Sequence, residues 1–263
     1  MEISAITIKR SKLSDVTSEE TKAMFDKIIK NIETIMNILE SISDEIFISF
    51  NGGKDCLATL IVIMYYFYCK EENKDYKSFS SYKDFCELNS NSKSKAFKNF
   101  KRITLVFFLV PDTFKEEIFY VYDIINMYEL NIKVINSSYI SGMYYMTKCS
   151  NLQYIFMGLR KSDLNEKDLV LHSDLMQRSD GSYPSFTRVY PIFNLKFQEV
   201  WMLILQSNIP YLCLYDQGFT SLGRKSKTKQ NDHLKIEKNI NFENKFLPAY
   251  MLTDEEFERT SRK

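Results

Sequence analysis

Apolar residues at helical spacing dominate positions 20 to 40. Thr17 and Glu20 stand three residues apart, the spacing of a capping box, and an apolar series follows in steps of three and four. We therefore predict an amphipathic helix here. Its apolar face would consist of Phe25, Ile28, Ile29, Ile32, Ile35, Met36 and Leu39.

Short apolar runs and longer helical patterns then alternate along the chain. The runs predicted as strands are residues 45–50, 103–110, 132–135, 153–157 and 188–192. The predicted helices are residues 55–69, 113–130 and 141–149, and a last helix with Phe197, Val200, Trp201 and Ile204 on one face. Because alternating strands and helices form crossover units, we expect a doubly wound, mostly parallel α/β sheet with helices on both faces. Its ligand crevice should lie at the carboxyl ends of the strands.

Two regions depart from this alternation. In residues 71–101, Lys, Asn, Ser and Asp dominate among scattered aromatic residues, so we interpret them as a partly mobile surface insertion and not as a separate domain. The chain after the last helix is loop-rich and polar, apart from the apolar stretch 246–252. We therefore expect an α/β core in residues 1–200 and a C-terminal segment, residues 201–263, packed on it.

Composition narrows the class of protein. Hydrophobic residues make up 44% of the 263 and charged residues 26%, as in ordinary globular proteins, and the formal net charge is +1. This balance gives no global attraction to nucleic acid or to an anionic membrane.

Five scattered cysteines, no C-x-x-C pair and only two histidines argue against a zinc or iron–sulfur site. The N-terminus lacks a secretory signal pattern. The longest apolar run, residues 60–69, is shorter than the roughly 20 residues that span a bilayer. We expect a soluble, cytoplasmic monomer with small-molecule partners.

The sequence SFNGGKD, Ser49 to Asp55, has the features of a phosphate-binding loop. Paired glycines between a strand and a helix let the backbone turn sharply and point N–H groups inward, beside the positive end of the helix dipole. Lys54 adds a charge, and Asp55 could hold Mg²⁺ through oxygen. The alternative is a plain strand–helix turn. The spacing fits neither G-x-x-x-x-G-K-[ST] nor G-x-G-x-x-G.

This loop resembles the pyrophosphate loop of the N-type ATP pyrophosphatases, which cleave ATP between the α and β phosphates. Within that superfamily the chain resembles the eukaryotic FAD synthases, the branch related to phosphoadenylylsulfate reductases. The chain differs from the family pattern at Lys161, Ser162, Tyr183 and residues 225–231. The resemblance implies an adenine nucleotide α-hydrolase-like fold. Beyond the loop it rests on VPDTFKEEIFYV (110–121), GLRKSD (158–163), FTRVYPIFNLKFQEVW (186–201), IPYLCLYDQGFTSLG (209–223) and FLPAYMLTDEEFERTSR (246–262).

The resemblance implies that the phosphate of FMN attacks the α-phosphorus of ATP, giving FAD and pyrophosphate with the help of Mg²⁺ on Asp55 or Asp163. Such chemistry needs positioning and charge neutralisation. The implied catalytic residues are Asn51, Asp55, Asp163, Arg259 and Arg262. ATP or its pyrophosphate would contact Ser49, Phe50, Asn51, Gly52, Gly53, Lys54, Asp55, Val110, Gly158 and Arg160. FMN would contact Asp163, Asp180, Tyr183, Phe186, Arg188, Tyr215, Asp216, Gln217, Gly218, Arg259 and Arg262.

Several of these residues have a simpler reading. Arg160 could pair with a surface carboxylate, residues 215–218 could form an ordinary turn, and a charged C-terminal tail is usually just solvated. The backbone near 108–110 is placed to meet adenine, yet its side chains could belong to a core strand. We expect Trp201 to be a core residue and Cys56 to pack in the loop.

Other functional classes are open to test. A reductase of adenylylated sulfate would need a catalytic cysteine near the C-terminus, and no cysteine follows Cys213. A tRNA-modifying enzyme would need paired cysteines or a basic RNA-binding lobe. A non-catalytic nucleotide sensor would bind ATP without releasing pyrophosphate.

Overall fold

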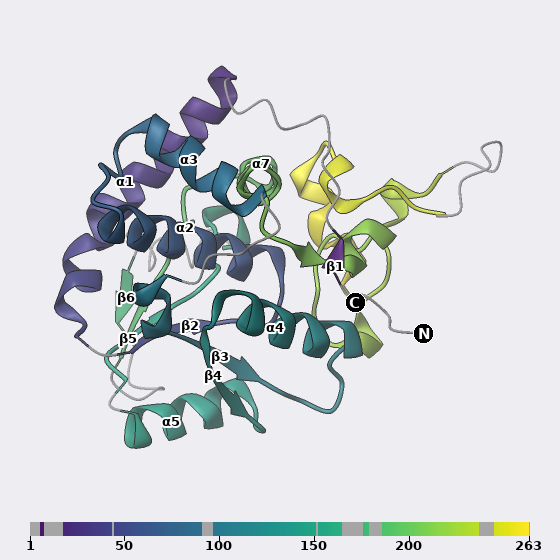
Figure 1. Cartoon of the computed structure of the whole chain (residues 1–263). Coiled ribbons are helices and arrows are strands. Elements are labelled where there is room, and N and C mark those ends of the chain that lie inside the picture. The colour runs from purple at the N-terminus through teal and green to yellow at the C-terminus, as the bar shows by residue number, and fades with distance from the viewer. Residues whose placement is uncertain are drawn as a thin grey trace.

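The computed structural model describes residues 6–7, 18–43, 45–90, 97–150, 152–164, 176–178, 186–236 and 245–262. At its centre is a six-stranded sheet in the order β4-β3-β2-β5-β7-β6 (Figure 1). Neighbouring strands from β4 to β7 run parallel, and β6 pairs antiparallel with β7 at the edge. The strands are β2 (Ile46–Ser49), β3 (Ile103–Phe108), β4 (Asn131–Ile135), β5 (Tyr154–Phe156), β6 (Met176–Arg178) and β7 (Thr187–Val189).

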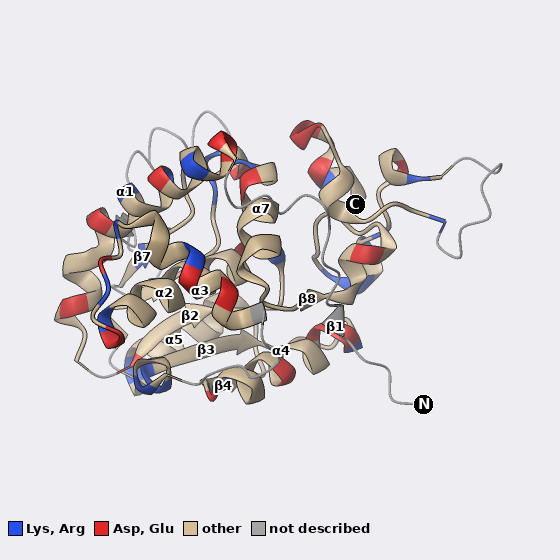
Figure 2. Ribbon diagram, turned by 45° about the horizontal axis from the view of Figure 1, so that its top comes forward, with Lys and Arg blue, Asp and Glu red and all other residues tan. Residues whose placement is uncertain are grey.

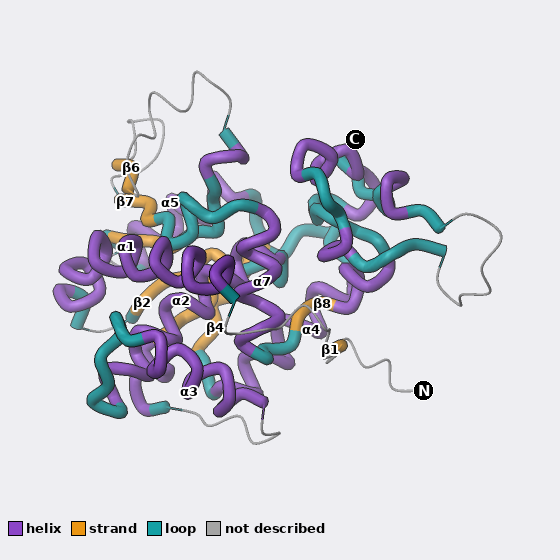
Figure 3. The backbone as a smooth tube through the Cα atoms, turned by 90° about the horizontal axis from the view of Figure 1, so that it is seen from above, coloured by secondary structure: helices purple, strands orange, loops and turns teal. Residues whose placement is uncertain are grey.

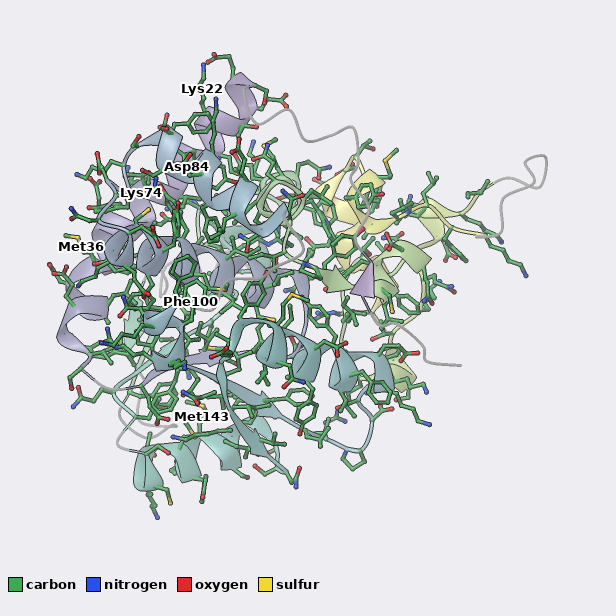
Figure 4. The ribbon with its side chains drawn as sticks, in the orientation of Figure 1. Lys22, Met36, Lys74, Asp84, Phe100 and Met143 are labelled. Atoms are coloured by element: carbon green, nitrogen blue, oxygen red, sulfur yellow. The ribbon has the colours of Figure 1, made fainter. Side chains whose placement is uncertain are left out.

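Helices cover both faces of this sheet, which confirms the predicted doubly wound α/β class (Figure 1). Side chains of β2 alternate between the two faces: Ile46 and Ile48 join the larger apolar cluster, and Phe47 joins the smaller one. The larger cluster holds residues of all the helices except α5, whose Met143 packs in the smaller one and is labelled in Figure 4. The helices are α1 (Glu19–Ser41), α2 (Lys54–Glu71), α3 (Phe79–Ser90), α4 (Lys115–Tyr128), α5 (Tyr139–Cys149) and α7 (Phe197–Ser207).

The order of connections places a crevice beside β2. Helix α2 leads from β2 to β3 and α4 leads from β3 to β4, so the chain moves outward in one direction. Helix α5 then brings the chain back past β2 to β5, on the other side. At such a reversal the loops after the two central strands separate and leave room for a ligand. The loops that follow β2 and β5 contain the motifs SFNGGKD and GLRKSD.

Helix α1 has the apolar face that its spacing predicts, with Phe25, Ile28 and Ile32 buried. Its N-cap is Ser18, whose hydroxyl accepts the N–H of Thr21 over 3.1 Å. The helix thus has an N-cap one residue after the predicted Thr17, and Thr17 itself lies outside the described residues.

The prediction of a surface insertion over residues 71–101 is wrong where the structure describes it. Helix α3 buries Tyr82, Phe85 and Cys86, all at most 3% exposed, and packs against α2 and α7. Lys74 and Asp84 form an ion pair of 2.5 Å on its outer side (Figure 4). The apolar residues fall three and four apart, but the polar residues between them obscured this spacing in the sequence.

The described residues after α7 form short 3-10 turns joined by loops, with one short strand, β8 (Tyr211–Leu212), paired with β1 (Ile6–Thr7) (Figure 3). The last turn, η7 (Glu255–Ser261), carries the ERTSR motif. The boundary predicted at residue 200 falls inside α7, and the division into two parts stays a prediction.

Figure 2 shows basic and acidic residues interspersed over the described ribbon, in keeping with the near-neutral net charge. Within the described residues, no helix combines the length and apolar character that crossing a membrane requires.

Candidate functional site

The loop between β2 and α2 has the backbone shape that its glycines predict. Gly52 has a φ of 80°, in the left-handed region, and a Cβ there would lie 2.9 Å from Cδ1 of Tyr120. Gly53 is the N-cap of α2, and its N–H donates to Asn51 Oδ1 over 3.1 Å. The loop therefore brings the positive end of the α2 dipole to the carboxyl edge of the sheet.

Gly158 presses the end of β5 against this loop. A Cβ on Gly158 would lie 2.4 Å from the carbonyl carbon of Asp55 and 2.5 Å from the backbone nitrogen of Cys56. No residue with a side chain fits at that separation without moving the backbone. This close approach places the GLRKSD motif beside the first turn of α2.

Two buried cations meet two carboxylates at the start of α2. Lys54 Nζ, on a side chain only 2% exposed, lies 2.8 Å from Asp55 Oδ2 and also pairs with Glu258 Oε1. The fully buried Arg160 places Nε 2.9 Å from Asp55 Oδ1 and pairs its guanidinium with Glu258 Oε2. Charges removed from water persist when they are paired in this way. The four side chains come from α2, the loop after β5 and the C-terminal tail.

A third carboxylate extends the cluster toward solvent. Asp163 accepts the backbone N–H of Arg160 over 2.9 Å and a hydrogen bond from Arg259 Nη2, also of 2.9 Å. The Arg259 side chain is 51% exposed, so its guanidinium is open to a ligand as well. Arg262 donates from Nη2 to the carbonyl of Leu222, which fixes the end of the tail.

Burial and charge act differently on the two aspartates. Burial raises the pKa of the Asp163 carboxyl, and Arg160 and Arg259 offset only part of that effect. Burial also acts to raise the pKa of Asp55, but the charges of Lys54 and Arg160 outweigh it and hold the pKa below its usual value. Asp55 is therefore ionised throughout the neutral range.

A cleft of about 380 Å³ opens beside this cluster. The residues predicted from the sequence that line it are Ser49, Phe50, Asn51, Gly53, Lys54, Asp55, Gly158, Asp163, Tyr215, Arg259 and Arg262. The lining also includes Cys56, which was expected to pack in the loop, and Phe108, from the segment expected to meet adenine. Residues that the sequence did not single out complete it: Val106, Tyr139, Met157, Leu159, Ser221 and Leu222.

Some residues predicted for the nucleotide occupy other positions. Arg160 lies outside the lining of the cleft and reaches it through Asp55 and Asp163. Val110 lies beyond the end of β3, where its carbonyl accepts the Thr113 hydroxyl over 2.8 Å. Two residues within β3, Val106 and Phe108, line the cleft instead.

The residues predicted to contact flavin lie in different parts of the structure. Phe186 is 2% exposed and packs in the cluster that contains α5, with the Arg188 guanidinium 5.2 Å from the centre of its ring. Asp216 is buried and accepts the Tyr211 hydroxyl over 2.9 Å, and Gly218 packs against Phe246. The exposed Gln217 does not line the cleft, and Asp180 and Tyr183 lie outside the described residues.

Tyr215 connects the C-terminal segment to the loop. Its ring is buried, and its hydroxyl accepts the backbone N–H of Lys54 over 2.7 Å. It therefore satisfies one of the free donors at the start of α2. The position in the sequence suggested a turn or a flavin contact, and the tie to α2 depends on a partner 161 residues away.

Cys56 packs in the loop, as expected. Its thiol donates to the carbonyl of Gly53 over 3.0 Å, and burial raises its pKa to about 12. Such a thiol stays protonated and is a poor nucleophile. Trp201, at 2% exposure, is a core residue, also as expected.

The chain is similar to known proteins along most of its length. The phosphoadenosine phosphosulfate reductase domain matches residues 140–230. A probable FAD synthase of Schizosaccharomyces pombe is 29% identical over 258 residues, which cover 97% of this chain and 86% of that protein. The flavin adenine dinucleotide synthase of Saccharomyces cerevisiae is 27% identical over 84% of this chain and 70% of its own length.

The chain is thus similar to FAD synthases of yeasts. A solved FMN adenylyltransferase of Candida glabrata, in complex with FAD and inorganic pyrophosphate, has the same fold, with a TM-score of 0.69 and 21% identity. The match covers 95% of this chain and 94% of the other. The sheet order and the reductase-like domain thus agree with the relation that the sequence motifs indicate.

Proposed function

We propose that this protein is an FMN adenylyltransferase, which transfers AMP from ATP to FMN to give FAD and pyrophosphate. One observation carries the proposal: SFNGGKD, GLRKSD and ERTSR, from distant parts of the sequence, converge on a single cleft at the carboxyl edge of the sheet. The similarity to an FAD synthase over 97% of the chain supports it.

The proposed ATP site is the loop Ser49 to Asp55 together with Gly158. The loop would hold the β and γ phosphates, which become the leaving group, by its backbone donors and the amino end of α2. Adenine would lie along the end of β3, beside Val106 and Phe108. Lys54 would act on the phosphates indirectly, because its ammonium group is already paired with Asp55 and Glu258.

The carboxylates fit a magnesium ion that is bound mainly by substrate. Among the described residues there is no group of three or more His, Cys, Asp or Glu side chains placed to hold a metal. Asp55 Oδ1 is buried, and its contact with Arg160 lacks the geometry of a hydrogen bond. Mg²⁺ commonly takes one or two carboxylates and completes its shell with phosphate oxygens and water. Asp55, with Asp163 as the second candidate, would hold the ion, which when bound supplies neutralisation of phosphate charge.

The proposed site for the FMN phosphate is Arg259 and Arg262, both on the cleft. A guanidinium offers a planar fork of donors that suits a phosphate. The catalytic role of Asn51 and the flavin contacts of Asp180, Tyr183, Phe186, Arg188 and residues 215–218 stay predictions, as do a cytoplasmic location and a monomeric state.

The test is product formation from ATP, Mg²⁺ and FMN. We expect FAD and pyrophosphate to appear together in equal amounts, and neither to appear when riboflavin replaces FMN. FAD would be followed by chromatography and pyrophosphate by a coupled assay. Binding of ATP without either product would rule out the synthase and favour a nucleotide sensor.

The same assay tests the proposed FMN phosphate site. Arg259→Ala should lower kcat/KM for FMN by ten- to a hundredfold, since it removes a charged contact worth roughly 1.5–3 kcal/mol. Arg224→Ala, at an exposed arginine that does not line the cleft, is the matched control and should retain full activity. Equal effects of the two substitutions would contradict the assignment.

A further inference from the structure

Glu258 is a buried carboxylate that the sequence motifs left without a role. Its residue is 4% exposed, and it faces the two buried cations of the cluster, Lys54 and Arg160. It is not part of the cleft lining. It therefore acts on the cleft through its neighbours.

The backbone around Glu258 is held firmly in place. The Thr220 hydroxyl donates to the Glu258 carbonyl over 2.6 Å, and Asn231 Nδ2 donates to the carbonyl of Phe257 over 2.8 Å. Thr220 and Asn231 are themselves fully buried. The tail thus presents the Glu258 side chain to the start of α2 in one fixed orientation.

The number of charges explains why Glu258 is needed beside Asp55 and Asp163. Lys54 and Arg160 carry two buried positive charges, and Asp55 contacts both of them. Without Glu258, these two cations would depend on Asp55 and on Asp163, which Arg259 also occupies. A divalent cation at Asp55 would then be repelled by Lys54 and Arg160, whose charges would be less fully neutralised.

We propose that Glu258 is a positioning residue that shares with Asp55 the neutralisation of Lys54 and Arg160, so that Asp55 can give up one of these contacts to bind a divalent cation with ATP. This inference deepens the proposed function and rests on it for the identity of the metal site. Each Glu258 oxygen takes one of the two cations, and Asp55 Oδ1 is left without a directed hydrogen bond.

The experiment compares Glu258→Gln with Glu256→Gln, an exposed carboxylate in the same turn. ATP binding would be measured by calorimetry over a series of Mg²⁺ concentrations, without FMN, so that no turnover occurs. For Glu258→Gln we expect the half-saturating Mg²⁺ concentration to rise about tenfold or more, as for other groups that orient metal ligands. ATP binding without Mg²⁺ should be unchanged or tighter, because the cations are less neutralised. Glu256→Gln should behave as the unaltered protein.

A purely structural role would weaken ATP binding with and without Mg²⁺ to the same degree, and that result would overturn the proposal. So would an unchanged Mg²⁺ dependence. If Glu258→Gln does not fold, Glu258→Asp replaces it, since a side chain shorter by one carbon withdraws the carboxylate from Lys54 and Arg160. A threefold or larger rise in the Mg²⁺ requirement then supports the proposal, and no rise contradicts it. If the unaltered protein binds ATP but forms no FAD, the proposed function fails while this series still decides the role of Glu258.

Discussion

The pKa values of two buried carboxylates, Asp55 and Glu117, shift in opposite directions because the two groups have different partners. Asp55 lies between two cations, which keep its pKa low. Glu117, in the first turn of α4, is 3% exposed and accepts the N–H of Phe114 over 3.1 Å, and the charge of Arg262 also favours its ionised form. Burial therefore raises the pKa of Glu117 to about 7.

Glu117 should make stability fall as pH rises. An unfolded glutamate loses its proton near its ordinary pKa of 4.5, whereas the folded protein keeps this proton up to about pH 7. The proton therefore stabilises the fold below pH 4.5, and this contribution is lost as pH rises toward 7. Over this window we expect a loss of roughly 1–3 kcal/mol in the free energy of unfolding. Urea unfolding at several pH values measures it.

Glu117→Gln should flatten that decline, since the amide oxygen still accepts the Phe114 N–H and no longer titrates. Glu20→Gln, at an exposed glutamate that does not contribute to the pKa shift of Glu117, is the control and should leave the slope as it is. An identical pH dependence in Glu117→Gln and the unaltered protein would contradict the assignment.

At the scale of elements, the site depends on how closely β5 and α2 approach. Gly158→Ala places a Cβ against the backbone of Asp55 and Cys56, so the first turn of α2 must shift. We expect at least a tenfold loss of turnover and a loss of roughly 1–3 kcal/mol in stability. Gly223→Ala is the matched control: its Cβ would meet only ordinary contacts, the nearest 3.5 Å from Thr228 Oγ1. Full activity in Gly158→Ala would show that the approach is not needed.

Most of the helices and strands could be predicted from the sequence, because their apolar residues repeat with the period of the structure that they form. Helix α3 did not, although Tyr82 and Phe85 have helical spacing, since Lys, Asp and Ser surround them. Its place against α2 and α7 is fixed by burial of those rings, a contact between segments distant in the chain.

At the scale of the whole molecule, the C-terminal segment and the core are joined through Trp201. This single tryptophan, on α7, packs edge-on against Tyr215 at 5.0 Å and Tyr250 at 5.9 Å between ring centres. Tyr215 and Glu258 also bond to the first residue of α2, Lys54. These ties favour unfolding as one unit, even if the chain divides near residue 200.

We therefore expect Trp201 fluorescence and far-ultraviolet circular dichroism to report the same urea midpoint. The fluorescence reports on the contact between α7 and the tail, and the dichroism reports mainly on the helices. Trp201→Phe is the control that assigns the fluorescence signal. A fluorescence transition at clearly lower urea would show that the segment detaches first and forms an independent unit.

The sequence by itself determined the α/β class, the turn between β2 and α2 and the motifs that converge on the cleft. It could do so because strand and helix periods are local, and because the turn needs a glycine at Gly52, whose φ is 80°. Parallel strands bring their carboxyl ends to one edge, so the meeting of SFNGGKD and GLRKSD was also predictable.

Only the tertiary structure decided which charges face one another. Lys54 was expected to meet phosphate directly, yet its ammonium group pairs with Asp55 and with Glu258, 204 residues away. Likewise Phe186 packs in the smaller apolar cluster and does not itself line the cleft. The physical reason is that burial and ion pairing depend on contacts between distant segments, and no local pattern of residues specifies the partner of a buried charge.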